Sequence, residues 1–551
     1  MAPRKTWSRR LALAGGAAAA AGGYLALRRP QSAGRHKVTE AHTFLRGNMA
    51  EPETLDPSLS SGIQEEEIIG DLMVGLMDLN PLARPIPGMA LRWESSADGL
   101  TWTFYLRQAL WSDGAPVTAH DFVYGWQRIL NPATASSYSY FLYVVKNAQP
   151  INAGKMPLTA LGAKALDDHT LEVHLEHPAP YLLEMLTHQT MLPLPRHVVE
   201  SKGRKWAQPG NYVGNGPFTL KAWVPNDHVL VEKNPRYYDA ANVALEKVYF
   251  FPTDDYGAAL QRFRAGELDV QTKLPAQQFG WIKANIPETV DTTPLLITEI
   301  ITINHKRAPF DDPRVREAIN LALNREALTQ RIVRVGDLPA YSFVPPSTAN
   351  YAGGAALDFR TMPPEKRMEK ARALMHSAGF DENNRVKTTY MIRVTTPGYQ
   401  RAVAAAIQQM LAQIYLDIAI TPNDMRVFYP AIQVHDFDMA QAGWSADFND
   451  ASNFLDLFRT GGGNNWGQYS NPAFDEALDG AQHEVNLQSR SQKLAAAEAI
   501  ALKDHAAMPL WFWINPNMVW PYVQGWKGNP LDFHRSRWVS IDQAARIQQF
   551  T

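Results

Sequence analysis

Hydrophobic and polar residues alternate in several short stretches of the chain, with the two-residue period of a β-strand. Residues 101–106 and 171–176 each place apolar side chains at every second position, and residues 295–304 form a longer run rich in β-branched residues. Because the side chains of a strand point alternately to its two faces, these stretches predict β-strands.

Other stretches repeat their apolar positions at the spacing of an α-helix. Val315, Ile319 and Leu323 follow an aspartate at position 312 and a proline at position 313, which together are typical of a helix start. The pattern predicts further helices over residues 364–378, closed by Gly379, over 401–416, over 491–505, and a short one from Asn471. Strands and helices interspersed in this way predict a mixed α/β fold.

The chain is long enough for several lobes. Its 551 residues, at roughly 100–200 residues per domain, predict three or more. Clusters of proline and glycine separate the predicted elements at residues 81–87, 210–217, 345–354 and 461–467. Cysteine is absent, which excludes a disulfide scaffold, a thiol nucleophile, an iron–sulfur cluster and a zinc site with cysteine ligands.

The first 37 residues differ from the rest in charge and hydropathy. They carry eight basic residues and no acidic one, which leaves −10 for the remaining chain within a formal total of −2. A basic start followed by the uncharged run 11–27 predicts an export signal, and Ser8–Leu13 resembles a twin-arginine signal. The run is also near the short limit of a membrane-spanning helix, so a retained N-terminal anchor is the alternative. Both interpretations predict a body in the periplasm.

Motifs for enzymatic catalysis are missing. Residues 443–447 fail the nucleophile-elbow pattern at the last position, and the sequence has neither a phosphate-binding glycine loop nor an H-E-x-x-H pair. Residues 435–438, with one histidine and two aspartates, are interpreted as part of a strand rather than as metal ligands. An acidic body is a poor partner for a phosphate backbone. We therefore expect no catalytic residue, no metal, no cofactor and no nucleic-acid partner.

Sequence blocks along most of the chain carry a resemblance. Residues 88–128 contain Trp111–Gly114, Pro116–Ala119 and Asp121–Val123. Further blocks follow in order at Asp167–Leu171, Asn215–Phe218, Pro309–Asp311, Arg314–Arg316, Pro339–Tyr341, Ala442–Trp444 and Ala446–Asp447. On these blocks, which cover nearly all of residues 40–545, the chain resembles the extracytoplasmic solute-binding proteins of peptide ABC transporters, family 5. Within that family it is most similar to the oligopeptide-binding and murein-peptide-binding proteins.

The resemblance implies a specific architecture. It is that of a three-lobed α/β periplasmic binding protein, class II-like and of cluster C, with a two-strand hinge between lobes I and III. Ligand would bind in the cleft between these two lobes, which closes around it. The implied divisions are an export signal and linker over 1–37, lobe I over 38–77, 198–296 and 514–551, lobe II over 78–197, and lobe III over 297–513.

The resemblance also implies roles for seven residues. Asp447 would pair with the α-ammonium group of a peptide ligand, and Gly443, Trp444 and Ser445 would offer a strand edge to which an extended peptide adds. Trp444 and Trp513 would line side-chain pockets, and Glu65 and Tyr138 would lie in the cleft. For the strand and the aromatic residues the alternative is ordinary core packing, and for Asp447 it is a surface loop.

The sequence departs from the family pattern where the ligand's carboxylate is expected. Basic residues of the family that meet this group align here with Gln441 and Ile432, and a third aligns near Val333, with Arg331 and Arg334 close by. The family's usual contact with the ligand's carboxylate is therefore lost or moved to other residues. We hypothesise a ligand longer than the family prefers, or one without a standard carboxylate at its distal end, such as a cell-wall peptide.

The resemblance implies a receptor rather than an enzyme. It would capture extended peptides with a free amino terminus in the periplasm and deliver them, as a monomer, to the membrane permease of an ABC importer. The alternative keeps the fold but binds a cell-wall peptide or another amine-bearing ligand for sensing or chaperoning, without transport.

Overall fold

The computed structural model describes residues 40–393 and 399–550. The predicted export signal, residues 1–37, lies outside the described residues. Within the described ranges, no helix has both the length and the apolar character needed to cross a membrane.

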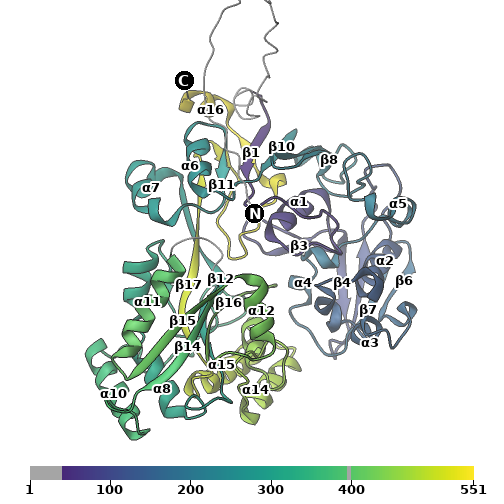
Figure 1. Cartoon of the computed structure of the whole chain (residues 1–551). Coiled ribbons are helices and arrows are strands. Elements are labelled where there is room, and N and C mark those ends of the chain that lie inside the picture. Colours follow the sequence, from purple (N-terminus) through teal and green to yellow (C-terminus); the bar gives the residue numbers. More distant parts are fainter. Residues whose placement is uncertain (1–39, 394–398, 551) are drawn as a thin grey trace, which may run out of the picture.

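A mixed sheet of eleven strands joins distant parts of the described chain (Figure 1). Ten strands follow one another across this sheet, and the eleventh, β13 (Leu338–Pro339), pairs with β17. The order is β15 (Leu416–Asn423), β14 (Val386–Arg393), β16 (Met439–Ser445), β12 (Val290–Ile303), β17 (Ala507–Val519), β11 (Val270–Gln271), β1 (Thr43–Gly47), β10 (Lys247–Phe251), β9 (His228–Lys233) and β8 (Phe218–Val224).

Two long strands, β12 and β17, connect the two halves of this sheet. They pair antiparallel in two stretches, Val290–Pro294 with Ile514–Met518 and Thr298–Thr302 with Ala507–Phe512, and the register shifts in between. In Figure 1 the yellow β17 runs from the part that holds β1 and β11 to the part that holds β14 and β16. The predicted α/β fold with a two-strand connection is confirmed, and the strand predicted from residue 295 begins earlier, at Val290.

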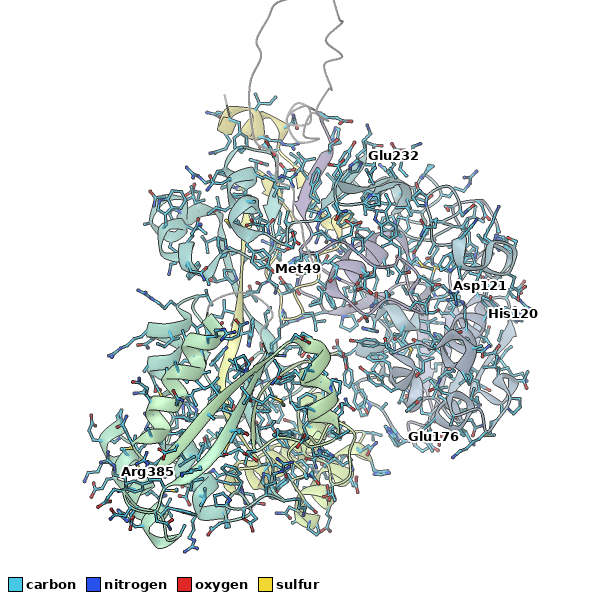
Figure 2. The ribbon with its side chains drawn as sticks, in the orientation of Figure 1. Met49, His120, Asp121, Glu176, Glu232 and Arg385 are labelled. Atoms are coloured by element: carbon cyan, nitrogen blue, oxygen red, sulfur yellow. The ribbon has the colours of Figure 1, made fainter. Side chains whose placement is uncertain are left out.

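A smaller sheet lies apart from the large one. It has the order β4 (Ala90–Ser95), β5 (Thr101–Leu106), β7 (Thr170–His174) and β6 (Ala163–Asp167), which confirms the two strands predicted here by alternation. Helix α2 (Ala119–Leu130) packs near it and begins with a capping box, in which Asp121 accepts a hydrogen bond from the Thr118 N–H at 2.8 Å (Figure 2). Two-stranded sheets pair β2 (Met77–Leu79) with β3 (Pro85–Pro87) and β18 (Val523–Gln524) with β19 (Ser540–Ile541).

The buried side chains of the described residues form two hydrophobic cores. One draws on residues 44–282 and 518–539, and the other on residues 296–511. The chain therefore passes from one core to the other along β12 and returns along β17. The exact lobe boundaries given above stay a prediction.

The helices largely follow the sequence pattern. Helix α8 (Pro313–Ala322) begins after Asp312, whose side chain accepts from the Arg314 N–H, and α10 (Pro364–Ser377) ends before Gly379, which has a φ of 92°. The remaining helices are α1 (Ile63–Leu72), α3 (Ala148–Asn152), α4 (Leu182–Met185), α5 (Arg196–Lys202), α6 (Tyr256–Arg264), α7 (Phe279–Asn285), α9 (Arg325–Ala327), α11 (Tyr399–Ala412), α12 (Met425–Gln433), α13 (Ser452–Leu455), α14 (Pro472–Gln482), α15 (Leu487–Lys503) and α16 (Gln543–Phe550).

Three local predictions need correction. The helix predicted over 401–416 ends at Ala412, because the chain turns with Tyr415 at a φ of 68° and Leu416 is already the first residue of β15. Helix α15 begins four residues before the predicted position 491, since Asn486 caps it. Residues 435–438 form a turn before β16 rather than a strand, and His435 has a φ of 58°.

Candidate functional site

Strand β16 has an open edge in the described part of the chain. On one side it pairs with β12 along its whole length, Met439–Ser445. On the other side its pairing with β14 covers only Met439 and Ala440. The backbone of Gln441–Ser445 therefore lies at an edge of the kind to which an extended chain can add by main-chain hydrogen bonds.

A cavity of about 270 Å³, here called the interlobe cavity, lies where this strand ends. Residues from the chain segments of both halves form it, so it lies between the two halves of the molecule. They include Ser61–Ile63 and Glu66 of the α1 region, Tyr138, His188, Gln189, Lys273, Leu295–Ile297, Ser445–Asp447 and Pro530–Phe533. The structure thus brings together three of the predicted site residues: Asp447, Ser445 and Tyr138.

A second cavity of about 580 Å³, here called the aromatic cavity, lies beside the first. Asp447 lines both, so its carboxylate marks their junction. The walls of the aromatic cavity include Trp444, Tyr140, and the rings of Tyr181 and Phe448, which stack at 4.9 Å. Trp444 was predicted to line a pocket, and the structure places it in this wall.

The surroundings of Asp447 leave its charge poorly compensated. Burial raises the pKa of Asp447 to about 6, and a hydrogen bond from the Tyr140 hydroxyl partly opposes this rise. Among the residues that the structure describes, no basic side chain forms an ion pair with Asp447. Asn453 fixes the position of this segment, since its Oδ1 accepts from Trp444 Nε1 at 2.6 Å and from the Asp447 N–H at 3.4 Å. The site therefore presents a partly buried carboxylate suited to a cation.

The neighbouring Glu66, rather than Glu65, lines the interlobe cavity. The Glu65 carboxylate instead accepts from the Glu53 N–H at 2.8 Å and from the Gln64 side chain at 3.2 Å. Burial raises the pKa of Glu66 to about 8, while Arg535 lowers it and the charges of Glu67 and Asp447 raise it further. Glu66 is therefore largely protonated at pH 7. Three consecutive acids on a helix point in three directions, so the sequence could not identify the one that faces the cavity.

A buried carboxylate, Glu299 of β12, organises the region next to Gly443. Glu299 is fully buried and accepts from Gln441 Nε2 at 2.7 Å and from Trp513 Nε1 at 3.2 Å. Arg393 Nη2 lies 3.5 Å from its Oε2 atom. Burial raises the pKa of Glu299, and Arg393 is the strongest opposing influence. These four residues, Glu299, Arg393, Gln441 and Trp513, are here called the Glu299 cluster.

The Glu299 cluster shows where the remaining predicted residues lie. Trp513 does not line either cavity, and its indole instead binds Glu299. Gly443 leaves room for the cluster, because a Cβ atom there would lie 2.8 Å from Glu299 Oε2 and 3.0 Å from Arg393 Nη2. Ile432 is fully buried in the second core. Sequence reasoning missed Glu299 and Arg393, since each comes from a strand other than β16.

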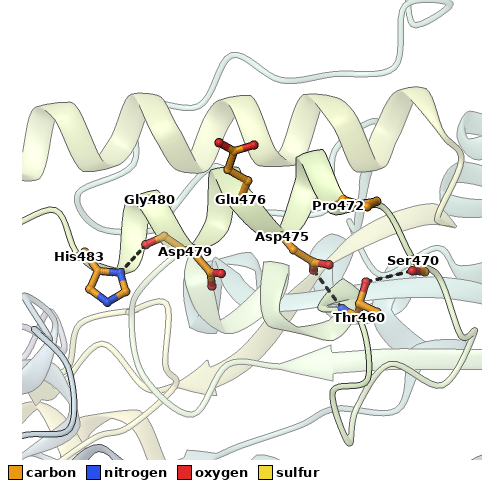
Figure 3. A pocket seen from close by; sticks show the side chains of 8 residues that line it. All are labelled: Thr460, Ser470, Pro472, Asp475, Glu476, Asp479, Gly480 and His483. Atoms are coloured by element: carbon orange, nitrogen blue, oxygen red, sulfur yellow. Dashed lines mark hydrogen bonds between the residues drawn. The ribbon is translucent and has the colours of Figure 1, made fainter.

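A third hollow, on the surface of α14, lacks convergent chemistry (Figure 3). The carboxylates of Asp475, Glu476 and Asp479 point in different directions. Asp475 accepts from the Thr460 N–H at 3.0 Å. Within the described ranges, no group of three or more histidine, aspartate or glutamate side chains could hold a metal ion.

Comparisons with known proteins agree on one kind of protein. A family model described as bacterial extracellular solute-binding proteins, family 5 middle, matches residues 84–466. The chain is 37% identical over 505 residues to the periplasmic oligopeptide-binding protein OppA of Salmonella typhimurium, covering 90% of this chain and 92% of that protein.

Solved structures give the same result. The unliganded open form of the periplasmic murein tripeptide-binding protein MppA superimposes with a TM-score of 0.80 at 32% identity, over 91% of this chain and 98% of that one. OppA of Haemophilus influenzae in complex with the peptide RPPGFSPFR gives a TM-score of 0.78 at 34% identity, over 91% and 99% of the two chains.

Proposed function

Because the chain belongs to the family 5 bacterial extracellular solute-binding proteins, we propose that it captures peptides in the periplasm and delivers them to an ABC importer. Members of this family are solute-binding receptors, and the predicted resemblance to them is confirmed. Relatives named for oligopeptide and murein peptide binding support a peptide ligand for this chain.

The observation that carries the proposal is the uncompensated carboxylate of Asp447 beside the open edge of β16. A peptide in extended form brings an ammonium group at one end and a row of amides along its length. The ammonium group would compensate the charge of Asp447, and the amides would pair with Gln441–Ser445. A charge-assisted hydrogen bond of this kind contributes about 1.5–3 kcal/mol net.

Several parts of the proposal concern partners and location. We propose that the loaded receptor docks on a membrane permease, that it acts as a monomer, and that it catalyses no reaction. We further propose that residues 1–37 direct export, with retention as a membrane anchor as the alternative. The periplasmic names of its relatives support this location.

The similarity to MppA supports a second candidate, in which the ligand is a cell-wall peptide or another amine-bearing molecule. In that case the same site would serve sensing or chaperoning without transport. Asp447 would still bind the ligand's ammonium group, since its environment favours a cation in either role.

Thermal unfolding tests the proposal directly. The protein is first unfolded and refolded to remove bound ligand, then heated with di- to octapeptides, a cell-wall tripeptide, disaccharides or nickel. A ligand at a hundred times its Kd adds about 2.7 kcal/mol to the free energy of unfolding. We therefore expect peptides to raise the Tm of the wild type clearly and to leave the Tm of Asp447→Asn unchanged. A rise with disaccharide or nickel alone would contradict the proposal.

A further inference from the structure

Three consecutive acids on α1 have different surroundings. Glu65 accepts a backbone N–H, and Glu67 forms an ion pair with Arg46 at 2.7 Å. Glu66 is only 5% exposed, and its Oε1 atom is buried without a hydrogen-bond partner. Among the residues that the structure describes, no basic side chain forms an ion pair with the Glu66 carboxylate. Two of the three acids are therefore satisfied within the protein, and the third lines the interlobe cavity.

The side chain of Gln189 repeats this feature. Gln189 begins the short helical turn Gln189–Met191, which packs against α1. It is 4% exposed, and its Oε1 atom is also buried without a hydrogen-bond partner. Glu66 and Gln189 both line the interlobe cavity and a smaller pocket next to it, so they lie together where the two spaces meet. Buried acceptors without donors are costly, so this wall favours a ligand group that brings N–H donors.

The charges around Glu66 make a cation the best donor. Arg535 donates to the Glu66 backbone carbonyl at 3.1 Å, and its charge lowers the pKa of Glu66. Glu67 and Asp447 act in the opposite direction, and burial is the largest influence. Asp447 therefore lies close enough for its charge to act on Glu66. Two carboxylates that share one cavity are suited to two positive charges.

The other titratable side chains around these two spaces do not supply the second positive charge. They are Tyr138, His188, Lys273, Asp532 and Asp78. The Lys273 ammonium group lies 3.9 Å from the Asp532 carboxylate, and Asp78 pairs with Arg537 at 2.8 Å. Burial lowers the pKa of His188 to about 3, so this histidine is neutral at pH 7.

We propose that Glu66 and Gln189 form a second cation subsite, which binds the side-chain ammonium group of a lysine or another diamino acid at the first or second position of the peptide. The inference rests on the proposed function, because it needs a peptide whose α-ammonium group lies at Asp447. An extended chain rises about 3.3 Å per residue, so a side chain at the third position begins roughly 7 Å beyond the first. Only the first two side chains start beside Asp447.

The two acids would then have separate tasks. Asp447 meets the α-ammonium group, which every peptide with a free amino terminus carries. Glu66 meets a group that only some peptides carry, so it sets selectivity rather than general affinity. Because Glu66 is largely protonated in the unliganded protein, a neutral side chain can still enter the cavity. A lysine side chain must displace that proton to form the ion pair.

The test compares lysine with norleucine, which has the same stem without the ammonium group. Calorimetry with the refolded protein measures the binding of Lys-Ala-Ala, Ala-Lys-Ala and Ala-Ala-Lys, each against its norleucine counterpart. The proteins are the wild type, Glu66→Gln and Glu184→Gln. Glu184 is the matched control, because burial raises its pKa to about 7 but it lines neither the interlobe cavity nor the aromatic cavity.

We expect the wild type and Glu184→Gln to bind the lysine peptide about tenfold more tightly than its norleucine counterpart when lysine is at position one or two. In Glu66→Gln the preference should fall below about threefold, and lysine at position three should give none in any of the proteins. Equal binding of both peptides by the wild type, or an unchanged preference in Glu66→Gln, would overturn the inference.

Proton release gives a second measurement, which needs no variant to fold. At pH 7 the pKa of about 8 leaves Glu66 protonated, so the lysine peptide should release close to one proton more than the norleucine peptide. Binding enthalpies in buffers with different heats of ionisation measure this difference, and its absence would also overturn the inference. If no peptide binds to the wild type, norleucine peptides included, the proposed function itself is refuted, so the two failures are distinguishable.

Discussion

Glu299 on β12 and Asp447 just after the end of β16 are two carboxylates in neighbouring parts of the molecule, but their surroundings differ. Glu299 is fully buried and has a glutamine, a tryptophan and an arginine around it. Asp447 lines two cavities, and burial raises its pKa to about 6, partly opposed by a hydrogen bond from the Tyr140 hydroxyl. Glu299 therefore has a cationic partner within the protein, whereas we propose that the cation for Asp447 is supplied by a bound ligand.

Replacing Asp447 should have the largest effect, and that effect should fall on peptide binding rather than on the stability of the unliganded protein. Asp447→Asn keeps the shape of the side chain but removes the charge that would pair with an ammonium group. We expect peptide binding to weaken by about 2–5 kcal/mol. The Tm of the unliganded protein should not fall, because the variant removes a desolvated charge without a cationic partner. Calorimetry and thermal unfolding would measure the two effects.

Removing the cationic partner of Glu299 should lower the stability of the fold rather than the affinity for peptide. Arg393→Gln removes the cation beside a buried carboxylate, and breaking such pairs costs about 3–5 kcal/mol. We expect a value near the lower limit, about 3 kcal/mol, because Arg393 is one-fifth exposed and lies 3.5 Å from Glu299. Denaturant unfolding would measure it. Adding Glu299→Gln should restore most of the loss, and a double variant no more stable than Arg393→Gln would contradict this account.

A methyl group at Gly443 should disturb the Glu299 cluster sterically. Gly443→Ala would place a Cβ atom 2.8 Å from Glu299 Oε2, so the side chains must shift, at a cost of about 1–3 kcal/mol. Gly463→Ala is the control, since nothing lies within 4 Å of its Cβ position. Denaturant unfolding of both variants gives the comparison, and equal stabilities would contradict the crowding.

Acid should weaken peptide binding through Asp447 more than through Glu299. The raised pKa of Asp447 means that the unliganded site takes up a proton as the pH falls through about 6, and the neutral form cannot pair with an ammonium group. We expect affinity to fall by up to tenfold per pH unit below 6, which corresponds to about 1.4 kcal/mol. Calorimetry from pH 7.5 to 5 would measure this slope. The slope should vanish in Asp447→Asn.

The stability of the unliganded protein should depend on pH in the opposite direction to its peptide affinity. Because the folded-state pKa of Asp447 lies above its ordinary value of 3.8, the unliganded protein binds this proton more tightly than the unfolded chain does. Asp447 therefore makes the unliganded fold less stable as the pH rises between about 4 and 6. The difference in unfolding free energy between the wild type and Asp447→Asn over this window isolates that contribution.

The sequence predicted the parts of the fold and site that depend on neighbouring residues. Asp312 and Pro313 predicted the start of α8, and alternation predicted β5 and β7. Asp447, Trp444 and Ser445 lie within four positions of one another, so a single family motif located them together. Local pattern was sufficient for the helix and the strands, whereas the three site residues were located only through the family resemblance, and their roles stay predictions.

Residues that meet through tertiary contacts were not predictable in this way. Glu299 and Gln441 are 142 positions apart, and only the antiparallel pairing of β12 with β16 brings them together. Arg393 reaches the same carboxylate from a third strand. The early end of α11 has a similar cause, because the polypeptide must turn before Leu416 to enter the sheet as β15.

The register shift between β12 and β17 lies at the site itself. The regular ladder is interrupted between Pro294 and Thr298, and the intervening residues Leu295–Ile297 line the interlobe cavity. There the Leu296 carbonyl accepts from the Ala446 N–H and the Leu296 N–H donates to Pro530, both at 2.9 Å. Leu295–Ile297 therefore belong both to the strand pair that joins the two halves and to the wall of the interlobe cavity. Under the proposed function, a ligand in this cavity would contact the backbone segment that joins the two halves, so the angle between the halves would itself report occupancy to a membrane partner.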